Sequence, residues 1–192
     1  MLKSITLYIA RSLEAITEWT GKIIAWLTLL MVLAVITVLI LRNIFHISAI
    51  PLQESVSYMH AIIFMLGAAF TLKHNDHVRV DVFYQTFSDK TKAVIDSLGF
   101  LLLLLPVSLF IFIYCIDYVV FNWELKEGSN QIGGLPYLYL LKSLLIIMPI
   151  ALILQGMAQL LTNISFLIGW IQSPYQKAAD PILQDTVETS HV

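Results

Sequence analysis

Four long stretches of this chain contain no Asp, Glu, Lys or Arg, and they limit its possible folds more than any other feature. The stretches cover residues 23–41, 55–72, 97–116 and 143–176. A bilayer core of about 30 Å requires roughly 20 residues of helix, and within lipid such a stretch satisfies its backbone polar groups only by bonding to itself. The sequence therefore predicts an all-α integral membrane protein with four transmembrane helices, at about residues 22–42, 54–73, 95–121 and 136–161.

The composition supports this fold class and excludes several others. Hydrophobic residues make up 58% of the chain and charged residues 12%, which is about half of the ~25% typical of a soluble domain. The net charge of −2 gives no positive field for binding nucleic acid. The single cysteine, Cys115, excludes an internal disulfide framework and a zinc site built from cysteines. The leucine run at 101–105 excludes the alternating strands of a membrane barrel.

The first 20 residues differ from the four apolar stretches because charged residues are interspersed among apolar ones. The apolar positions at helical spacing are Leu2, Ile5, Ile9, Leu13 and Ile16. Between them lie Lys3, Arg11, Glu14 and Glu18. This pattern predicts an amphipathic helix over 1–20 that lies in the membrane interface. The alternative is that these residues extend the first transmembrane helix or pack on a partner.

Lysine and arginine residues predict the orientation of the helices, because they are enriched in cytoplasmic loops. With both termini in the cytoplasm, eight of the eleven lie on the cytoplasmic side and three on the outer side. We therefore expect both termini to be cytoplasmic. The predicted transmembrane domain covers residues 21–172, and a polar cytoplasmic tail covers 173–192.

Three ionisable side chains fall within the predicted spans, where such groups are costly and often functional. His60, Asp117 and Lys142 each lie five or six residues from the predicted outer end of their helix, so they have a similar depth. The sequence predicts a polar layer that joins three helices. Its functional interpretation is a proton or ion site, and its structural interpretation is interhelical pairing with a lysine that reaches the headgroups.

The predicted outer loops carry further candidate residues. Arg42 and Glu54 bracket the first outer loop, where they could form a salt bridge or contact lipid headgroups. Trp123 suits an aromatic belt at the membrane surface. The loop that follows it, residues 123–135, is either a flexible connector or long enough to contact a periplasmic partner.

The predicted cytoplasmic loop after the second span alternates polar and apolar residues over 74–82. Its candidate residues are His77, Arg79 and Asp81. Histidine and aspartate are common metal ligands, but nothing in a basic loop enforces the geometry, so we predict no metal site. Ser88, which follows this loop, is expected to cap the third transmembrane helix.

Several short motifs resemble one family of membrane proteins. They are Arg42-Asn43-Ile44-Phe45 after the first span, Gln53-Glu54-Ser55 at the start of the second, and His77-Val78-Arg79-Val80-Asp81 in the following loop. The last motif is the most specific, because the family has a similar His-hydrophobic-Arg-Val-Asp run in a cytoplasmic loop. Over roughly residues 20–170 the chain resembles the small membrane subunit of tripartite ATP-independent periplasmic (TRAP) transporters.

This resemblance implies a multi-pass, non-enzymatic subunit of the bacterial inner membrane, with no catalytic, substrate or metal site and no cofactor. Its implied partners are a large membrane permease subunit, a periplasmic substrate-binding protein and membrane lipids. The large subunit would carry the substrate and sodium sites and move as an elevator. The small subunit would enlarge the stationary scaffold and help to dock the binding protein during uptake, typically of an organic acid.

Two other functions are compatible with four apolar helices. A haem-carrying electron-transfer protein needs axial ligand pairs inside the bundle, but only His60 of the five histidines lies within a predicted span. An autonomous proton-coupled exporter needs a central carboxylate that faces the bundle. Asp117 is the only candidate, and it lies near one edge of the membrane. The sequence therefore favours the accessory subunit over both alternatives.

Overall fold

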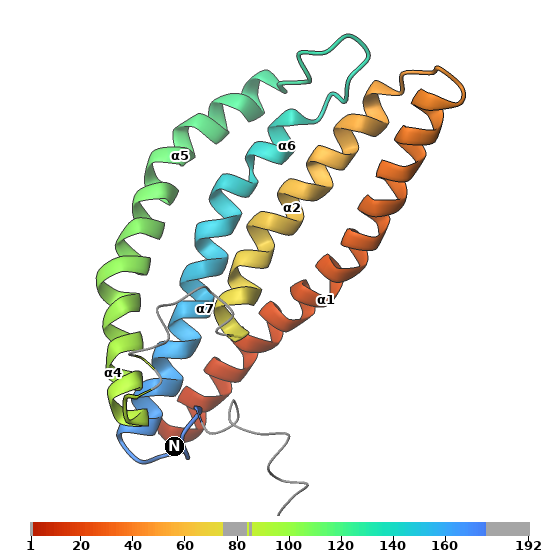
Figure 1. Ribbon diagram of the computed structural model, residues 1–192. Helices are drawn as coiled ribbons and strands as arrows, with labels where there is room; N and C mark the ends of the chain where they lie inside the picture. The colour runs from red at the N-terminus through yellow and green to blue at the C-terminus, as the bar shows by residue number, and fades with distance from the viewer. Residues whose placement is uncertain (1, 75–83, 85, 176–192) are drawn as a thin grey trace, which may run out of the picture.

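The computed structural model describes residues 2–74, 84 and 86–175, and its regular elements are all helices (Figure 1). They are α1 (Leu2–Asn43), α2 (Ile50–His74), α4 (Asp89–Gly99), the π-helix η1 (Phe100–Leu104), α5 (Leu105–Leu125), α6 (Leu138–Lys142) and α7 (Leu144–Leu167). Within the described residues, four stretches are long and apolar enough to cross a membrane: Lys3–Asn43, Ile50–His74, Asp89–Leu125 and Leu138–Leu167. The prediction of an all-α protein with four such helices is confirmed.

The structure differs from the sequence prediction at the N-terminus. Residues from Leu2 onward do not form a separate helix but are the first turns of α1, which continues to Asn43. No proline interrupts the helix, because the first proline of the chain is Pro51. The 42 residues of α1 correspond to about 63 Å at 1.5 Å per residue, roughly twice the thickness of a hydrocarbon core.

The third long helix consists of α4, η1 and α5 in succession. Ser88 caps its N-terminus as predicted, because its Oγ accepts a hydrogen bond from Thr91 N at 3.3 Å. The π-helical turn has a local cause. Pro106 has no amide hydrogen for the regular helical pattern, and Leu105 N just before it donates to the carbonyl of Phe100, five residues earlier. Single π-helical turns of this kind occur inside longer α-helices.

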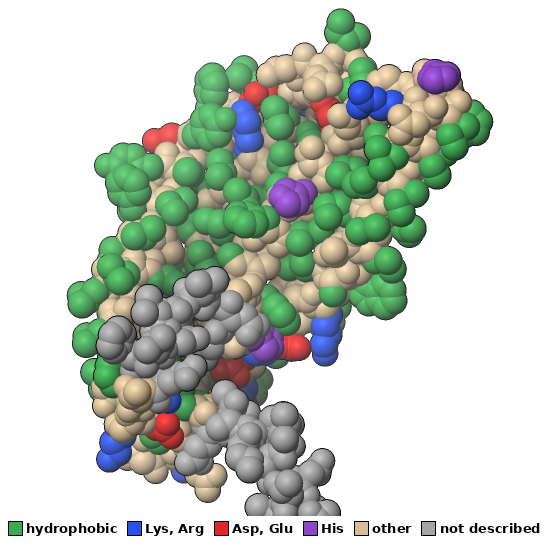
Figure 2. Space-filling model, in the orientation of Figure 1, with side chains coloured by type: hydrophobic (Ala, Val, Ile, Leu, Met, Phe, Trp, Pro, Cys, Tyr) green, Lys and Arg blue, Asp and Glu red, His purple; other side chains and the backbone are tan. Residues whose placement is uncertain are grey.

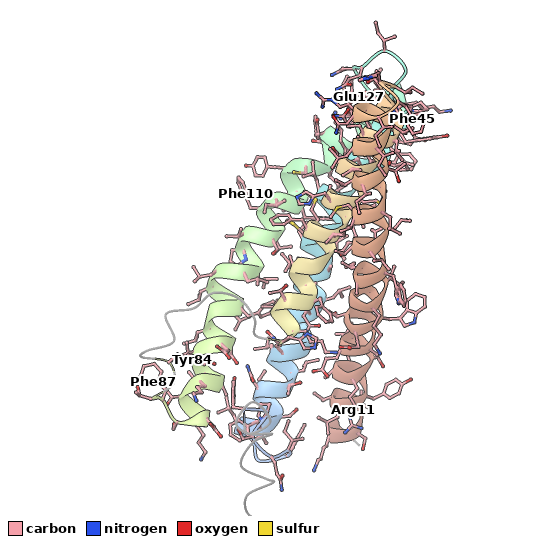
Figure 3. The ribbon with its side chains drawn as sticks, turned by 45° about the vertical axis from the view of Figure 1, so that its right-hand side comes forward. Arg11, Phe45, Tyr84, Phe87, Phe110 and Glu127 are labelled. Atoms are coloured by element: carbon pink, nitrogen blue, oxygen red, sulfur yellow. The ribbon has the colours of Figure 1, made fainter. Side chains whose placement is uncertain are left out.

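Helix α7 lies at the centre of the bundle. It packs against α1 and α2, which also contact each other, and against α4, η1 and α5. Figures 1 and 3 show α1 and α5 on opposite sides of α2 and α7. The connections at 44–49 and 126–137 lie at one end of the bundle, here called the loop end. The N-terminus, the last turns of α2 and α7 and the start of α4 lie at the other, the N-terminal end (Figure 1).

Small and polar side chains make up most of the buried residues among those described. The buried residues include five alanines and the polar residues Thr17, Ser108, Asn122, Gln155, Asn163 and Ser165. Many large apolar side chains point outward instead, and Figure 2 shows them along the middle of the visible face, with most of the charged side chains near the two ends. Small residues at helix contacts with apolar residues outside are typical of helices that pack in lipid.

Candidate functional site

The segment that connects α5 to α6, residues 126–137, has a defined backbone structure at the loop end. Ser129 N donates a hydrogen bond to the carbonyl of Leu135 at 3.0 Å, which closes the base of a loop. Gly134 N donates to the carbonyl of Gln131 at 3.0 Å, which forms a turn at its tip. The loop therefore keeps its shape through its own backbone as well as through the side chains described next.

Glu54 of α2 connects this loop to the bundle. One of its carboxylate oxygens accepts a hydrogen bond from Ser129 Oγ, and the other accepts one from Leu135 N at 2.6 Å. Gly134 permits this approach, because a Cβ at that position would lie only 2.7 Å from Glu54 Oε1. Of the two alternatives that the sequence left open for Arg42 and Glu54, the salt bridge is not formed. Arg42 is exposed and makes no ion pair with any described residue.

Lys142, at the end of α6, forms a second anchor for the loop. Its Nζ donates to Asn122 Oδ1 at 2.7 Å and to Glu127 Oε2, and it lies 4.7 Å from the centroid of the Tyr118 ring. Only 18% of the lysine side chain and 30% of the Glu127 side chain are exposed. Such a sheltered pair is more sensitive to the loss of one partner than an exposed ion pair, because the remaining charge is left without compensation.

Trp123 belongs to the same cluster at the loop end. Its Nε1 donates to Ser143 Oγ at 2.8 Å, and its ring packs edge-on against Tyr139 with centroids 4.9 Å apart. These contacts join the last turns of α5 to the junction between α6 and α7. A tryptophan with a bonded N–H and a half-exposed ring suits the border between lipid and water.

The predicted polar layer of His60, Asp117 and Lys142 does not form within the described residues. His60 and Asp117 are exposed. Neither makes an ion pair or a hydrogen bond with a described residue, and the His60 ring stacks on Phe64 at 6.5 Å. Equal depth does not fix the direction of a side chain. The partner of Lys142 on α5 is Asn122, five residues after Asp117 and thus about 140° further around the helix.

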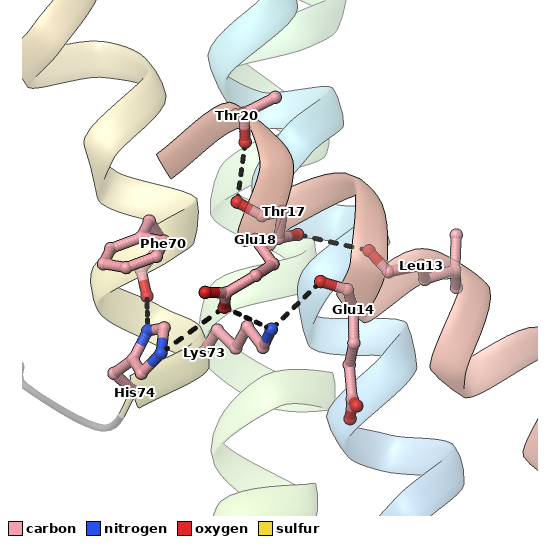
Figure 4. Close-up of polar contacts among 8 residues, drawn as sticks. All are labelled: Leu13, Glu14, Thr17, Glu18, Thr20, Phe70, Lys73 and His74. Carbon is pink, nitrogen blue, oxygen red and sulfur yellow. Dashed lines mark hydrogen bonds and ion pairs between the residues drawn. The ribbon is translucent and has the colours of Figure 1, made fainter. Parts of the chain in front are cut away.

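At the N-terminal end, polar contacts join α1 to the last turn of α2 (Figure 4). Lys73 Nζ lies 2.7 Å from Glu18 Oε2 and donates to the carbonyl of Glu14 at 3.1 Å. His74 Nε2 lies 3.6 Å from the same Glu18 oxygen, and its ring packs on Phe70 with centroids 4.2 Å apart. These contacts fix α2 directly before the loop that carries the most specific sequence motif.

That motif itself, with His77, Arg79 and Asp81, lies outside the described residues. Beyond the loop, Tyr84 donates to Asp96 Oδ2 at 2.7 Å. The hydroxyl of Tyr175 lies 3.0 Å from the same oxygen. Burial, together with the Asp96 carboxylate, raises the pKa of Tyr175 well above its usual value. Residues on both sides of the loop are thus anchored to the bundle.

Three residues that hold the loop end were not among the sequence candidates: Asn122, Glu127 and Ser129. The sequence contained one indication of them. Lys142 lies within a predicted transmembrane span, and a lysine there requires acceptors nearby. Asn122 is only 2% exposed, and both groups of its amide are bonded: Nδ2 donates to the carbonyl of Tyr118, and Oδ1 accepts from Lys142 Nζ. Its identity as the acceptor depends on the rotation of α5, which the sequence does not specify.

A cleft of about 510 Å³ lies between α2, η1 and α7, with a mostly apolar lining that includes Leu72, Phe100 and Leu103. Gln159 also lines it, but its Nε2 is bonded to the carbonyl of Leu72 at 2.6 Å. In the described part of the chain, no group of three or more His, Cys, Asp or Glu could hold a metal ion. The polar contacts of the described residues join helices and loops to one another.

Comparison with known proteins identifies the family. Residues 10–166 match the family model described as "Tripartite ATP-independent periplasmic transporters, DctQ component". No curated protein and no solved structure matches the chain. The matched residues include most of each of the four long helices and both polar clusters described above. The chain therefore belongs to the DctQ family, the non-enzymatic small membrane component of TRAP transporters.

Proposed function

We propose that this chain is the scaffold subunit of a sodium-coupled, ATP-independent uptake system for an organic acid in the bacterial inner membrane. It packs on a large, elevator-type permease subunit that carries the substrate and the coupling ion. Its loop end faces the periplasm and helps to dock the substrate-binding protein. The family supports membership in a tripartite transporter, and the following observations support the role within it.

The observation that carries the scaffold role is the distribution of side chains on α1. Its inner face has small residues such as Ala10 and Thr17, which are buried in the bundle. Its outer face has Trp26, Leu30 and Leu33, each more than half exposed. A bilayer core of about 30 Å cannot cover a helix of about 63 Å along its whole length if the helix stands upright. An apolar partner surface would cover part of this face.

The first 20 residues of α1 are the part that we place in the cytoplasmic membrane interface. Tyr8 and Trp19 have apolar rings with polar tips, which suit that region. Lys3 and Arg11 lie on a different side of the helix and are exposed to pair with anionic headgroups. A tilt where the helix leaves the bilayer core accounts for a helix longer than the core is thick. It also keeps the apolar rings in the interface and the basic side chains near the headgroups.

The orientation rests on the distribution of basic residues, with most lysines and arginines at the N-terminal end of the bundle. A single cysteine placed in each loop would test it in a variant without Cys115. Labelling of intact cells with a membrane-impermeant thiol reagent should reach cysteines at 44–49 and 126–137. Labelling of the N-terminal end instead would reverse the proposed orientation.

No structural observation favours either alternative function. The carboxylate of Asp117 is exposed on the outside of α5, whereas an autonomous exporter needs one facing the interior of the bundle. His60 is exposed on α2 and is the only described histidine inside a helix away from its ends. A haem held between two axial side chains would need a second ligand beside it.

The decisive experiment is affinity purification of the tagged chain from its native membrane in a mild detergent. We expect one larger multispanning protein in stoichiometric amount, identified by mass spectrometry. Proteoliposomes that contain both proteins should take up an organic acid only with an inward sodium gradient and the purified binding protein. Recovery of the chain alone, or uptake that does not depend on it, would contradict the proposal.

A further inference from the structure

We propose that the loop at 128–135 is a preformed recognition element for the periplasmic substrate-binding protein, with Ile132 as its apolar anchor. This inference rests on the proposed function and extends it by assigning the docking contact to one loop and one side chain. It draws on three observations: the exposure of Ile132, the fixed shape of the loop, and its position beyond the helices.

Ile132 is 96% exposed, more than any other large hydrophobic residue of the described chain. Its neighbours Asn130, Gln131 and Gly133 are also exposed and carry no charge. A single exposed isoleucine on a protein surface needs no explanation in itself. Here it lies at the tip of a loop and is surrounded by uncharged polar groups. An apolar centre with a polar rim is the arrangement of a small protein-binding site.

Hydrogen bonds at both ends of the loop fix its shape. Glu54 holds Ser129 and Leu135, and Lys142 holds Glu127 at the base of the loop. Gly133, next to the anchor, has a φ of 78°, a conformation that a residue with a Cβ rarely adopts. A loop that is already ordered loses little conformational entropy on binding, so more of the contact energy appears as affinity.

The position of the loop favours a soluble protein as its partner over lipid or the permease subunit. Figure 1 shows the loop beyond the end of α5, away from the middle of the bundle. The exposed charges of Glu124 and Lys126 lie between the apolar part of α5 and the tip, so the tip lies on the water side of them. The periplasmic component of a tripartite transporter reaches the complex from that side.

The test uses the reconstituted complex of this chain, the permease subunit and the purified cognate binding protein. Uptake is measured as a function of binding-protein concentration for the wild type and for Ile132→Ser. We expect the half-saturating concentration to rise about tenfold, the effect of losing one interface anchor, while uptake at saturation stays unchanged. Ile132→Leu should restore the wild-type concentration dependence, because it keeps an apolar side chain of equal size.

The control is Ile44→Ser, which removes another exposed apolar side chain from the loop end. It should leave the half-saturating concentration unchanged. An unchanged value for Ile132→Ser, or an equal rise for both variants, would overturn the assignment to this loop. A complex that fails to assemble, or uptake without this chain, would refute the proposed function instead, so the two failures are distinguishable.

A photo-crosslinking amino acid at position 132 identifies the contact directly. In the same proteoliposomes, we expect a covalent adduct with the purified binding protein that increases when the transported substrate is present. An adduct with the permease subunit alone, or with lipid alone, would overturn the inference.

Discussion

The two ends of the bundle are held together by different kinds of contact. At the loop end, the charged side chains of Glu54 and Lys142 hold a connecting loop in place. Toward the N-terminal end an ion pair is also present, but aromatic rings lie directly on glycines of neighbouring helices, at Gly21 of α1 and at Gly156 in the middle of α7. A loop has no extended apolar surface to bury, so its shape depends on directed hydrogen bonds, whereas helices gain most from close packing.

The difference predicts which substitutions each end tolerates. The loop end should be sensitive above all to the removal of a charge. The N-terminal end should be sensitive to one added methyl group and should tolerate the loss of a charge. The following four predictions test this contrast, from the largest expected effect to the smallest.

Replacing Glu127 by alanine should have the largest effect, because it leaves the sheltered ammonium of Lys142 without its anionic partner. We expect a loss of about 2 kcal/mol, below the 3–5 kcal/mol for a fully buried pair since both side chains retain some exposure. The measurement is thermal unfolding of the purified chain in detergent. The double variant Glu127→Ala/Lys142→Met should recover part of this loss, because no charge remains unpaired. Additive losses would show that the two groups do not interact.

Adding a methyl group at Gly21 or Gly156 should destabilise helix contacts away from the loop end. A Cβ on Gly21 would overlap the ring of Phe70, and a Cβ on Gly156 would overlap the ring of Phe100. Each alanine variant should therefore cost about 1–2 kcal/mol, the lower part of the range for overpacking of a tight contact. The measurement is again the thermal unfolding midpoint.

The matched controls are alanine substitutions at Gly67 and Gly99, which lie in helices but have no neighbouring atom within 4 Å of a Cβ. Alanine has a higher helix propensity than glycine, so these variants should be neutral or slightly more stable. If all four substitutions had the same effect, close packing would not distinguish the N-terminal end, and the contrast between the ends would fail.

The sequence predicted the helices well because the apolar stretches have a direct physical meaning in lipid. It also marked Glu54, Trp123 and Lys142 as residues of interest, since polar groups next to lipid need partners. It did not predict the partners. For Glu54 it offered either a salt bridge with Arg42 or contact with headgroups, but the hydrogen bonds of Glu54 are with Ser129 and Leu135, more than 70 residues away.

The close contacts of the N-terminal end could not be predicted for a related reason. Gly67 lies in a run of small residues that indicates close packing, yet it has no neighbour within 4 Å of a Cβ, whereas Gly21 and Gly156 do. Which small residue faces another helix depends on the rotation of each helix about its axis. That rotation is set by all the contacts along the helix, and a single sequence does not contain it as a local pattern.

Replacing Lys73 by methionine should have a small effect, in contrast to the loss of a charge at the loop end. The charge that it leaves behind is the Glu18 carboxylate, whose side chain is 36% exposed, whereas Glu127→Ala leaves the ammonium of Lys142, whose side chain is only 18% exposed. Exposed and partly exposed pairs contribute about 0.2–1 kcal/mol, and the contribution should shrink as salt is raised. Unfolding at low and high salt would measure it, with Lys90→Met as a control at an exposed lysine. A loss as large as that of Glu127→Ala would contradict the comparison.

Gln155 lies in α7 between the two ends and should be the most tolerant position of all. It is 1% exposed, and neither polar atom of its amide has a hydrogen-bond partner among the described residues. An unpaired buried amide contributes no favourable interaction in the folded state and loses its hydration on folding. Gln155→Leu should therefore leave the unfolding temperature unchanged or raise it, although a substitution at so buried a position normally destabilises.

Gln159→Leu is the matched test, because that amide donates to the carbonyl of Leu72 and its loss leaves a backbone acceptor without its partner. If Gln155→Leu proved the more harmful of the two, the buried amide would have an interaction of its own, and the middle of α7 would be held by directed bonds, as the loop end is.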